Sequence, residues 1–488
     1  MRPAVLLLVL ALAAGMVLRC SGFDAPFENG SRGINGSWYA GQAARHFDAF
    51  GFGATRGVPR LASFPGTLED SVLYVTHPAP LSWLLWAGSQ VLPGEMGLRL
   101  VPLLAALLSL PLCWWMLRRH ASPLAAAAGT LVWATLPMAS WFGSIPSGES
   151  LLLPWLFGFW MLAERWLQGG RPHTLAAFFF LGACLDWSFY WAGPALAVVV
   201  LLRGAFRAQW KVLLLLAAMG TLALALTLVH LAWASGGCAS FRAHLTGVLG
   251  TGLHGPDAVS DLMGSLMRHV LAVHGWPSIF VLAGLFAGAL FCVRRVVTLR
   301  ASFIFFAVVA LLHTSVFARH AAIHEFWTMP ACGLFACAAA MLVDACSTAR
   351  ARAAVALLML AAASVLALRS QALSAEMATA EHRERVAAIP ELGEEHCIAL
   401  VEPFWIQEVW YARAHVWPKV DSEAQLLRMS DAYARIYAGS SARPSIVIVL
   451  ERGRSDASAL GLRRAVNALG LAPVARGAFD VYRIPGSG

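Results

Sequence analysis

The sequence predicts an all-α polytopic membrane protein, with about 11 transmembrane helices, that ends in a small α/β domain. Of the 488 residues, 59% are hydrophobic and only 13% are charged, about half the charged share of an average soluble domain. Apolar runs of span length recur up to residue 370 and then stop. The net charge is +9, but the basic residues lie in short clusters between the apolar runs. That distribution is typical of membrane topology signals and argues against a nucleic-acid partner.

Candidate membrane spans follow one another along most of the chain. A span needs roughly 17 to 25 mainly apolar residues. The segments that meet or approach this requirement are 3–19, 97–117, 121–142, 150–166, 173–187, 188–203, 211–234, 275–293, 302–318, 326–345 and 353–369. The stretch 79–94 is apolar but short and contains Pro80 and Pro93, so we expect a helix that lies at the membrane interface. The first run resembles a cleaved signal peptide in length, but the later spans favour an uncleaved anchor.

The basic residues determine the predicted orientation. With Met1 in the cytoplasm and 79–94 not crossing, every predicted cytoplasmic turn is basic, as the positive-inside rule requires. These turns hold Arg118 and Arg119, Arg165 and Arg171, Arg203, Arg207 and Lys211, Arg294, Arg295 and Arg300, and Arg350 and Arg352. The sequence therefore predicts a multi-pass membrane protein with its N-terminus in the cytoplasm. The first loop, 20–96, and the region after residue 370 would then be extracytoplasmic.

The same topology gathers the unusual polar residues of the membrane region, 1–370, on the extracytoplasmic side. They are Asp24, Glu28, Glu69, Asp70 and His77 in the first loop, Glu149 in the turn 143–150, Asp186 at a span end, His244, His254, Asp257 and Asp261 in the loop 235–274, and Arg319, His320, His324 and Glu325 before the tenth span. Ionisable groups near membrane depth are costly to keep and usually mark a functional site. We therefore expect an outward-facing active cleft that is covered by the first loop.

Residues 371–488 are predicted to form a soluble domain in which helix and strand patterns alternate. Helical patterns cover 374–388, 422–437 and 456–469, and strand patterns cover 397–402, 445–450 and 474–484. The odd number of preceding spans places this domain on the extracytoplasmic side. It has no glycine-rich nucleotide-binding loop, so we expect an accessory or acceptor-facing role.

Several motifs of residues 1–370 occur together in one known family. They are Tyr39-Ala40, Ala44-Arg45, Gly51, Thr55-Arg56-Gly57, His77-Pro78-Ala79-Pro80-Leu81, Arg99-Leu100-Val101-Pro102, Glu149, Asp186-Trp187 and Ile323-His324-Glu325-Phe326-Trp327. With these motifs the chain resembles the GT-C glycosyltransferases, and most closely a bacterial family-39-like group that is similar to protein O-mannosyltransferases and aminoarabinose transferases. The resemblance implies a GT-C fold and transfer of a sugar, with inversion, from a polyprenyl-phosphate donor to an extracytoplasmic lipid, glycan or protein.

The resemblance also implies roles for individual residues. In the family a first-loop aspartate acts as general base or binds a metal ion that holds the donor phosphate. Here the usual acidic pair would fall near Gly36-Ser37, where neither residue is acidic. We therefore predict that Asp24 is the catalytic carboxylate, with Glu28 as the alternative. The predicted substrate-binding residues are His77, Arg99 and His324 for the donor phosphate, Glu149 for the sugar or a metal, and Asp186 and Glu325 beside them.

Other interpretations of these residues stay open. Asp24, Glu28 and Glu149 could cap helix N-termini, and Arg99 could extend toward lipid headgroups. The histidines lack the spacing of a zinc site, so the metal ligands are unknown, no cofactor is certain, and a divalent metal ion is an alternative. A non-enzymatic transporter or flippase for lipid-linked sugars would have internal repeats and charges at the membrane midplane, which the sequence does not show. The missing acidic pair also permits a degenerate GT-C scaffold.

Overall fold

The structure of the chain is a computed structural model that describes residues 3–25, 27, 35–61, 72–75, 77–242, 259–316, 325–377, 397–400, 415–417, 446–453, 457–476 and 479–484. The chain divides into two compact units. The first unit comprises residues 1–24 and 75–376, and the second comprises residues 25–74 and 377–488. Each unit is described by itself.

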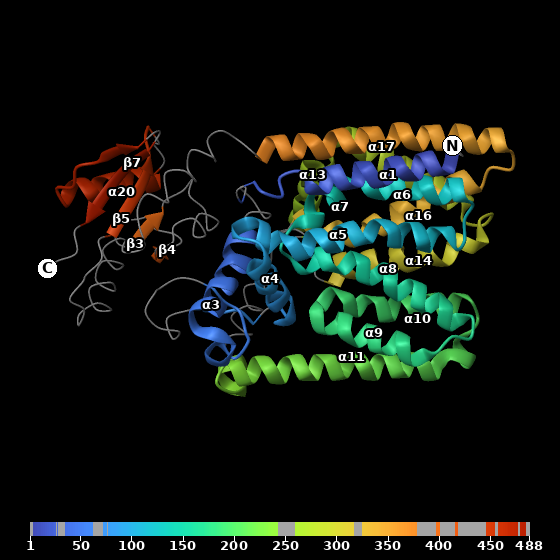
Figure 1. The fold of residues 1–488 in the computed structure, drawn as a ribbon, viewed down its shortest axis with the longest axis horizontal. Coiled ribbons are helices and arrows are strands. Elements are labelled where there is room, and N and C mark those ends of the chain that lie inside the picture. The colour runs from blue at the N-terminus through green and yellow to red at the C-terminus, as the bar shows by residue number, and fades with distance from the viewer. Residues whose placement is uncertain are drawn as a thin grey trace. The chain divides into compact units, whose positions relative to one another are not determined.

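The first unit is a bundle of helices (Figure 1). Its helices are α1 (Pro3–Cys20), α4 (Pro80–Val91), α5 (Gly94–Arg118), α6 (Pro123–Thr135), α7 (Pro137–Trp141), α8 (Gly148–Leu167), α9 (Pro172–Leu185), α10 (Ala192–Leu202), α11 (Phe206–Ala234), α13 (Val259–Cys292), α14 (Val297–Val316), α16 (Cys332–Asp344) and α17 (Ala349–Met377). Short 3-10 helices, η3 (Phe142–Ser144), η4 (Trp187–Trp191) and η5 (Glu325–Ala331), connect some of them.

The membrane prediction is confirmed for the described part of the chain. Each predicted span lies on one of these helices or on a broken pair. By length and composition, 7 helices can cross a membrane, or 8 if α6 and α7, which meet at 63°, form one bent span. Helices α9 and α10 are apolar but shorter. Helix α4 has 12 residues, which rise about 18 Å, so it is too short to cross.

Helix α6 lies at the centre of the bundle and packs against α1, α5 and α16. Small side chains allow this close approach. A methyl group on Gly129 would lie 2.5 Å from the carbonyl oxygen of Ala336. The span window of α16 is 72% buried, whereas those of α11 and α17 are each only 22% buried. The latter two therefore lie at the periphery, where their exposed leucines and valines suit contact with lipid.

The two ends of the bundle carry different polar residues. At one end, which we call the Glu149 end, α1 and α9 finish and α5 and α8 begin. At the opposite end, which we call the Glu164 end, α8 finishes and the turn between α5 and α6 lies against it.

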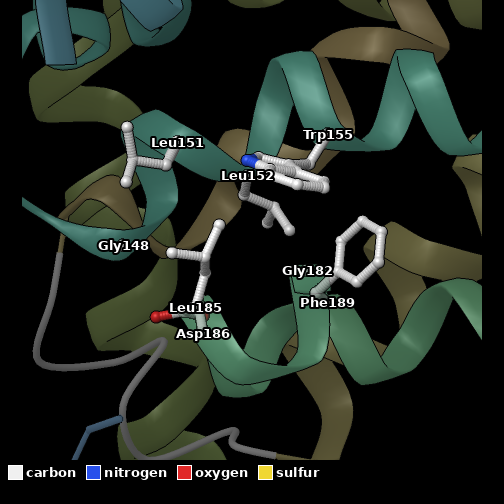
Figure 2. A pocket seen from close by; sticks show the side chains of 8 residues that line it. All are labelled: Gly148, Leu151, Leu152, Trp155, Gly182, Leu185, Asp186 and Phe189. Carbon is white, nitrogen blue, oxygen red and sulfur yellow. The ribbon is translucent and has the colours of Figure 1, made fainter. Parts of the chain in front are cut away.

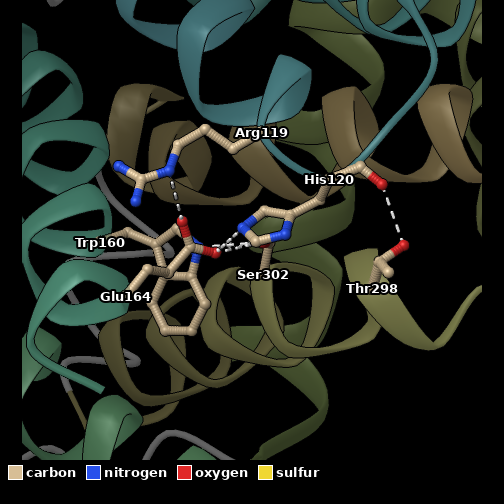
Figure 3. A network of polar contacts seen from close by, with 6 residues as sticks. All are labelled: Arg119, His120, Trp160, Glu164, Thr298 and Ser302. Atoms are coloured by element: carbon tan, nitrogen blue, oxygen red, sulfur yellow. Dashed lines mark hydrogen bonds and ion pairs between the residues drawn. The ribbon is translucent and has the colours of Figure 1, made fainter. Parts of the chain in front are cut away.

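A polar network holds helices together at the Glu164 end (Figure 3). The side chain of Glu164 is 2% exposed and lies 2.5 Å from Nε2 of His120 and 3.7 Å from Nε of Arg119. Its Oε1 also accepts a hydrogen bond from Ser302 at 3.5 Å, and Ser302 accepts one from the indole of Trp160 at 2.8 Å. Because burial of an unpaired carboxylate is costly, these partners fix α8 to α14 and to the turn between α5 and α6.

The second unit includes a folded part of the first loop. It consists of η1 (Asn35–Gly41), α3 (Gln42–Thr55), β1 (Arg60–Leu61) and β2 (Val72–Leu73), and β1 and β2 pair in antiparallel fashion. Arg56 ends α3 in the left-handed conformation, with φ of 53°, and Gly57 follows with φ of 67°. The rings of Tyr39 and Tyr74 lie 4.8 Å apart. The motif Thr55-Arg56-Gly57 is thus a helix-terminating turn.

The C-terminal part of the second unit is α/β, as predicted. Its elements are β3 (Cys397–Leu400), β4 (His415–Trp417), β5 (Ile446–Glu451), α20 (Ala457–Ala468), β6 (Val474–Arg476) and β7 (Phe479–Ile484). They include a 5-stranded sheet of order β4-β3-β5-β7-β6, in which β3 runs parallel to β4 and β5. The predicted strand 474–484 is in fact two antiparallel strands, β6 and β7. The predicted helix 422–437 and most of 374–388 lie outside the described residues.

Candidate active site

Two buried carboxylates meet at the Glu149 end of the bundle. Glu149 lies in the first turn of α8 and is 2% exposed, and Asp186 follows the last residue of α9 and is 4% exposed. The two side chains are close enough for their charges to interact. Buried carboxylates are costly unless they are paired, protonated or bound to a ligand. This pair is therefore the strongest candidate for a functional site in the described residues.

Asp186 has one satisfied and one unsatisfied oxygen. Its Oδ1 accepts a hydrogen bond of 2.8 Å from the backbone N–H of Ser188, which caps η4. Its Oδ2 is buried and has no hydrogen-bond partner among the residues that the structure describes. The side chain is therefore held in place by one oxygen and presents the other to the N-terminus of α8.

Gly148 makes this arrangement possible, and sequence reasoning missed it. A methyl group at this position would lie 1.9 Å from Oδ2 of Asp186 and 2.6 Å from its Cγ. Every other residue would displace the carboxylate. A helix-initiating glycine beside an acid gives no distinctive sequence signal, so only the structure identifies its role.

His77 lies close to the same carboxylate. It belongs to the segment that precedes α4 and is half-buried. Burial lowers the pKa of His77, and the neighbouring charge of Asp186 partly opposes that effect. An imidazole whose pKa lies below the ordinary 6.5 is neutral at pH 7. His77 can therefore donate or accept a hydrogen bond at the site without adding a positive charge.

A small apolar pocket opens beside the carboxylates (Figure 2). It encloses about 220 Å³, its open mouth included, and is lined by Gly148, Leu151, Leu152, Trp155, Gly182, Leu185, Asp186 and Phe189. In Figure 2 the side chains of Leu152, Trp155 and Phe189 point toward one another. Gly182 leaves space for the ring of Phe189, because a methyl group at position 182 would lie 2.4 Å from that ring. The pocket is smaller than the roughly 300–1,000 Å³ of a typical ligand site, and Asp186 is the acid among its lining residues.

Arg99 lies at the same end of the bundle but is 1% exposed. Its Nη1 donates hydrogen bonds to the carbonyl oxygens of Gly22 at 3.1 Å and Phe23 at 3.2 Å. The next residue, Asp24, is exposed. Arg99 therefore fixes the backbone that leads to the predicted catalytic aspartate, and its contact with a donor phosphate stays a prediction.

Three predicted site residues cannot be located relative to Glu149, Asp186 and Arg99. Glu28 and His324 lie outside the described residues, as does the side chain of Glu325, whose backbone begins η5. Within the described part of the chain, no three His, Cys, Asp or Glu side chains are grouped as metal ligands. The divalent metal ion thus stays a prediction, for which Glu149 and Asp186 supply two carboxylates.

Comparison with known proteins identifies the fold. No model of a known protein family matches the chain, and neither does the sequence of any curated protein. Solved structures do match. ArnT from Cupriavidus metallidurans has a TM-score of 0.65 in the apo state and 0.66 bound to undecaprenyl phosphate, with 15% identity over 98% of this chain and 97% of ArnT in both. The chain has the GT-C fold.

A second GT-C protein agrees with this conclusion. The oligosaccharyltransferase of Archaeoglobus fulgidus in its apo form has a TM-score of 0.57 and 13% identity, over 92% of this chain and 69% of that protein. The predicted resemblance to GT-C proteins is therefore confirmed at the level of the fold. Within this GT-C bundle, the predicted residues that the structure brings together are His77, Glu149 and Asp186.

Proposed function

We propose that this protein is an integral-membrane glycosyltransferase that moves a sugar from a polyprenyl-phosphate donor to an acceptor on the extracytoplasmic side. The observation that carries the proposal is the buried pair Glu149 and Asp186, with one carboxylate oxygen unsatisfied in the described structure, beside an apolar pocket at one end of a GT-C bundle. Enzymes place unpaired ionisable groups where charge develops during a reaction.

The reaction requires a base and stabilisation of positive charge on the sugar. An acceptor hydroxyl attacks the anomeric carbon, the bond from that carbon to the phosphate oxygen breaks, and polyprenyl phosphate leaves with the electron pair. The hydroxyl proton passes to a carboxylate within hydrogen-bond reach. Asp24, or Glu28, takes this role in the proposal, because both belong to the start of the first loop.

The buried residues act on the donor. The carboxylates of Glu149 and Asp186 would stabilise the positive charge on the sugar ring and orient its hydroxyls. His77 would donate a hydrogen bond to the leaving phosphate, which Arg99 and His324 are also expected to contact. Glu325 is expected to bind the donor or the acceptor beside them. The apolar pocket would exclude water, which strengthens each of these interactions.

The proposed setting is the bacterial inner membrane, with the Glu149 end facing the extracytoplasmic side. The basic turns at the opposite end support it, since His120 and the neighbouring arginines lie there beside Glu164. The partners are then the lipid bilayer, the polyprenyl-phosphate sugar, and a lipid, glycan or protein acceptor. That the solved ArnT structure holds undecaprenyl phosphate supports a lipid-phosphate donor.

A second candidate is a degenerate GT-C scaffold without transferase activity. The absence of an acidic pair at Gly36-Ser37 favours it. A non-enzymatic transporter or flippase of lipid-linked sugars would bind the same donors. Both alternatives predict binding without transfer, so one assay separates them from the enzyme.

The test uses the purified full-length protein in lipid nanodiscs with a panel of radiolabelled polyprenyl-phosphate sugars and a membrane extract as acceptor source. Transfer by the wild type, abolished in Glu149→Gln and Asp186→Asn, is the expected result. Asp24→Asn and Glu28→Gln identify the base, and a chelator arm tests for a divalent ion. Asp48→Asn, an exposed acid of α3, is the matched control. Donor binding without transfer to any acceptor would refute the proposed transferase activity.

A further inference from the structure

Helix α6 is broken at its end by Pro137, and the carbonyls of its last turn lie within hydrogen-bond distance of other donors. Proline has no N–H, so it cannot bond to the carbonyl of Trp133, four residues before it. Arg19 of α1 does so instead: its Nη2 donates to Trp133 O at 3.4 Å, and its Nη1 donates to Ala134 O at 2.8 Å. The guanidinium therefore replaces hydrogen bonds that a continuous helix would make.

The other carbonyls of the last turn of α6 also lie near hydrogen-bond donors. Leu136 N–H donates to Val132 O at 3.0 Å. The hydroxyl of Ser370, on α17, lies 3.2 Å from Thr135 O and 3.0 Å from Leu366 O of its own helix, and its single proton can be donated to either. Four carbonyls at a helix end have no partner within the helix, and here each of them has a donor within hydrogen-bond distance. Contacts with neighbouring elements therefore stabilise the break at Pro137.

The same arrangement occurs a second time. Helix α13 is interrupted at Gly275, whose φ is 66° and ψ 159°, and Pro277 follows. Val273 stands four residues before that proline, and Arg369 of α17 donates from Nε to Val273 O at 3.2 Å and from Nη2 to Ala272 O. A positive charge is also favourable at the C-terminal end of a helix segment, where the helix dipole is negative.

The break at Pro137 directs the chain into the candidate site. A methyl group on Gly143 of η3 would lie 3.2 Å from Cβ of Ala106 and 3.8 Å from Nε of Arg19, so η3 lies within the reach of one methyl group of both α5 and the guanidinium. From η3 the chain needs only a few residues to reach Glu149, and all residues from 125 to 154 are buried. A close-packed segment has no space in which to absorb a displacement.

We propose that Arg19 is a positioning residue of the active site: by capping the broken end of α6 it fixes η3 and, through it, the N-terminus of α8 that carries Gly148 and Glu149. The catalytic part of this inference rests on the proposed function. The capping part does not, because it concerns hydrogen bonds that can be tested without turnover.

The first experiment is a double-mutant cycle on thermal unfolding of the full-length protein in nanodiscs. Arg19→Met leaves two buried carbonyls unsatisfied and lowers the melting temperature by several degrees. Pro137→Ala restores an N–H that can bond to Trp133 O, so the double variant melts at a higher temperature than Arg19→Met. If the losses of melting temperature in the two single variants simply add in the double variant, Arg19 does not cap the broken end of α6. Arg118→Met removes an arginine–carbonyl hydrogen bond of 3.1 Å at the Glu164 end and is the matched control.

The second experiment follows the site itself by hydrogen exchange and by turnover. In Arg19→Met, amides of residues 145–152 exchange faster, while those of α14 do not change. Turnover falls about a hundredfold, the loss expected for a misplacement of about 1 Å, and KM for the donor changes by less than about twofold. Arg118→Met leaves both unchanged.

The outcomes distinguish the positioning role of Arg19 from the proposed transferase activity. Unchanged exchange, or wild-type turnover in Arg19→Met, overturns the positioning role. Wild-type turnover in Arg19→Lys also overturns it, because lysine keeps the charge but lacks the two-pronged donor geometry of arginine. If the wild type transfers no sugar, the proposed function fails, and the exchange result alone decides whether Arg19 orders the N-terminus of α8.

Discussion

The substitution Gly148→Ala tests the geometry of the candidate site with one methyl group. The added Cβ would lie 1.9 Å from Oδ2 of Asp186, whereas ordinary contact begins at 3.4 Å. The carboxylate, or the first turn of α8, must therefore move by about 1.5 Å. Asp186 is itself held by its hydrogen bond to Ser188, so neither group can move without loss of a contact.

Two effects of opposite sign set the expected magnitude. Gly148 is the first residue of α8, and alanine favours a helix over glycine by about 0.5–1 kcal/mol. Overpacking a filled site costs about 1–3 kcal/mol. The free energy of unfolding should thus fall by about 1–2 kcal/mol. Because misplacement of a catalytic group by about 1 Å can cost about a hundredfold in rate, sugar transfer should fall far more than stability.

The measurement compares turnover and thermal melting for Gly148→Ala and Gly284→Ala. A methyl group at Gly284, on α13, would meet nothing within 4 Å, so this control should keep wild-type turnover. Wild-type turnover in Gly148→Ala would refute the reasoning, because it would mean that Asp186 does not need its place beside α8. A large loss of stability with no change in turnover per folded molecule would refute it equally.

Three further predictions concern other parts of the chain. Burial favours a higher pKa for Asp480, but hydrogen bonds from Arg463 and Arg452 outweigh it and hold that pKa below 3.8. The stability they give is present above pH 3.8 and is lost as the pH falls through the folded pKa. The difference in melting temperature between wild type and Asp480→Asn should therefore be full at pH 7 and should shrink as the pH falls below 3.8. Glu164→Gln should lower the free energy of unfolding by about 1–3 kcal/mol, measured by denaturation in nanodiscs, and an unchanged midpoint would contradict the network. Arg99→Met should speed hydrogen exchange at residues 21–25 and reduce sugar transfer, and protection equal to that of the wild type would contradict its anchoring role.

The helices were predictable because their causes are local. Apolar runs of span length and basic turns follow directly from the cost of placing charge in lipid. Alternation of helix direction then predicts that Glu149, Asp186 and His77 share one end of the bundle, and the structure shows interacting charges among them. The C-terminal strand 474–484 was predicted as one because only two residues separate β6 from β7 in the sequence, and no strong break stands out in the pattern.

The details of the site depend on contacts that no local pattern contains. Pro137 within the run 121–142 indicates that the carbonyl of Trp133 lacks its usual helical donor. The donor that replaces it, Arg19, belongs to a helix more than a hundred residues earlier in the chain. Gly148 and Asp186 are likewise distant in sequence, and their fit exists only after α8 and α9 have packed. A sequence can therefore predict that a polar partner is required, and only the folded chain identifies it.

The two buried glutamates of α8 have a consequence for how substrates could enter. Glu149 and Glu164 are separated by about 22 Å along the helix axis, and each is buried at its own end of the bundle. A shift of α8 by one turn would separate Glu164 from His120 and Asp186 from Gly148 at the same time. Helix α8 is thus a fixed reference within the bundle. In the proposed transferase, motions that admit the donor and the acceptor would then come from the elements around α8, while the two carboxylates stay in place.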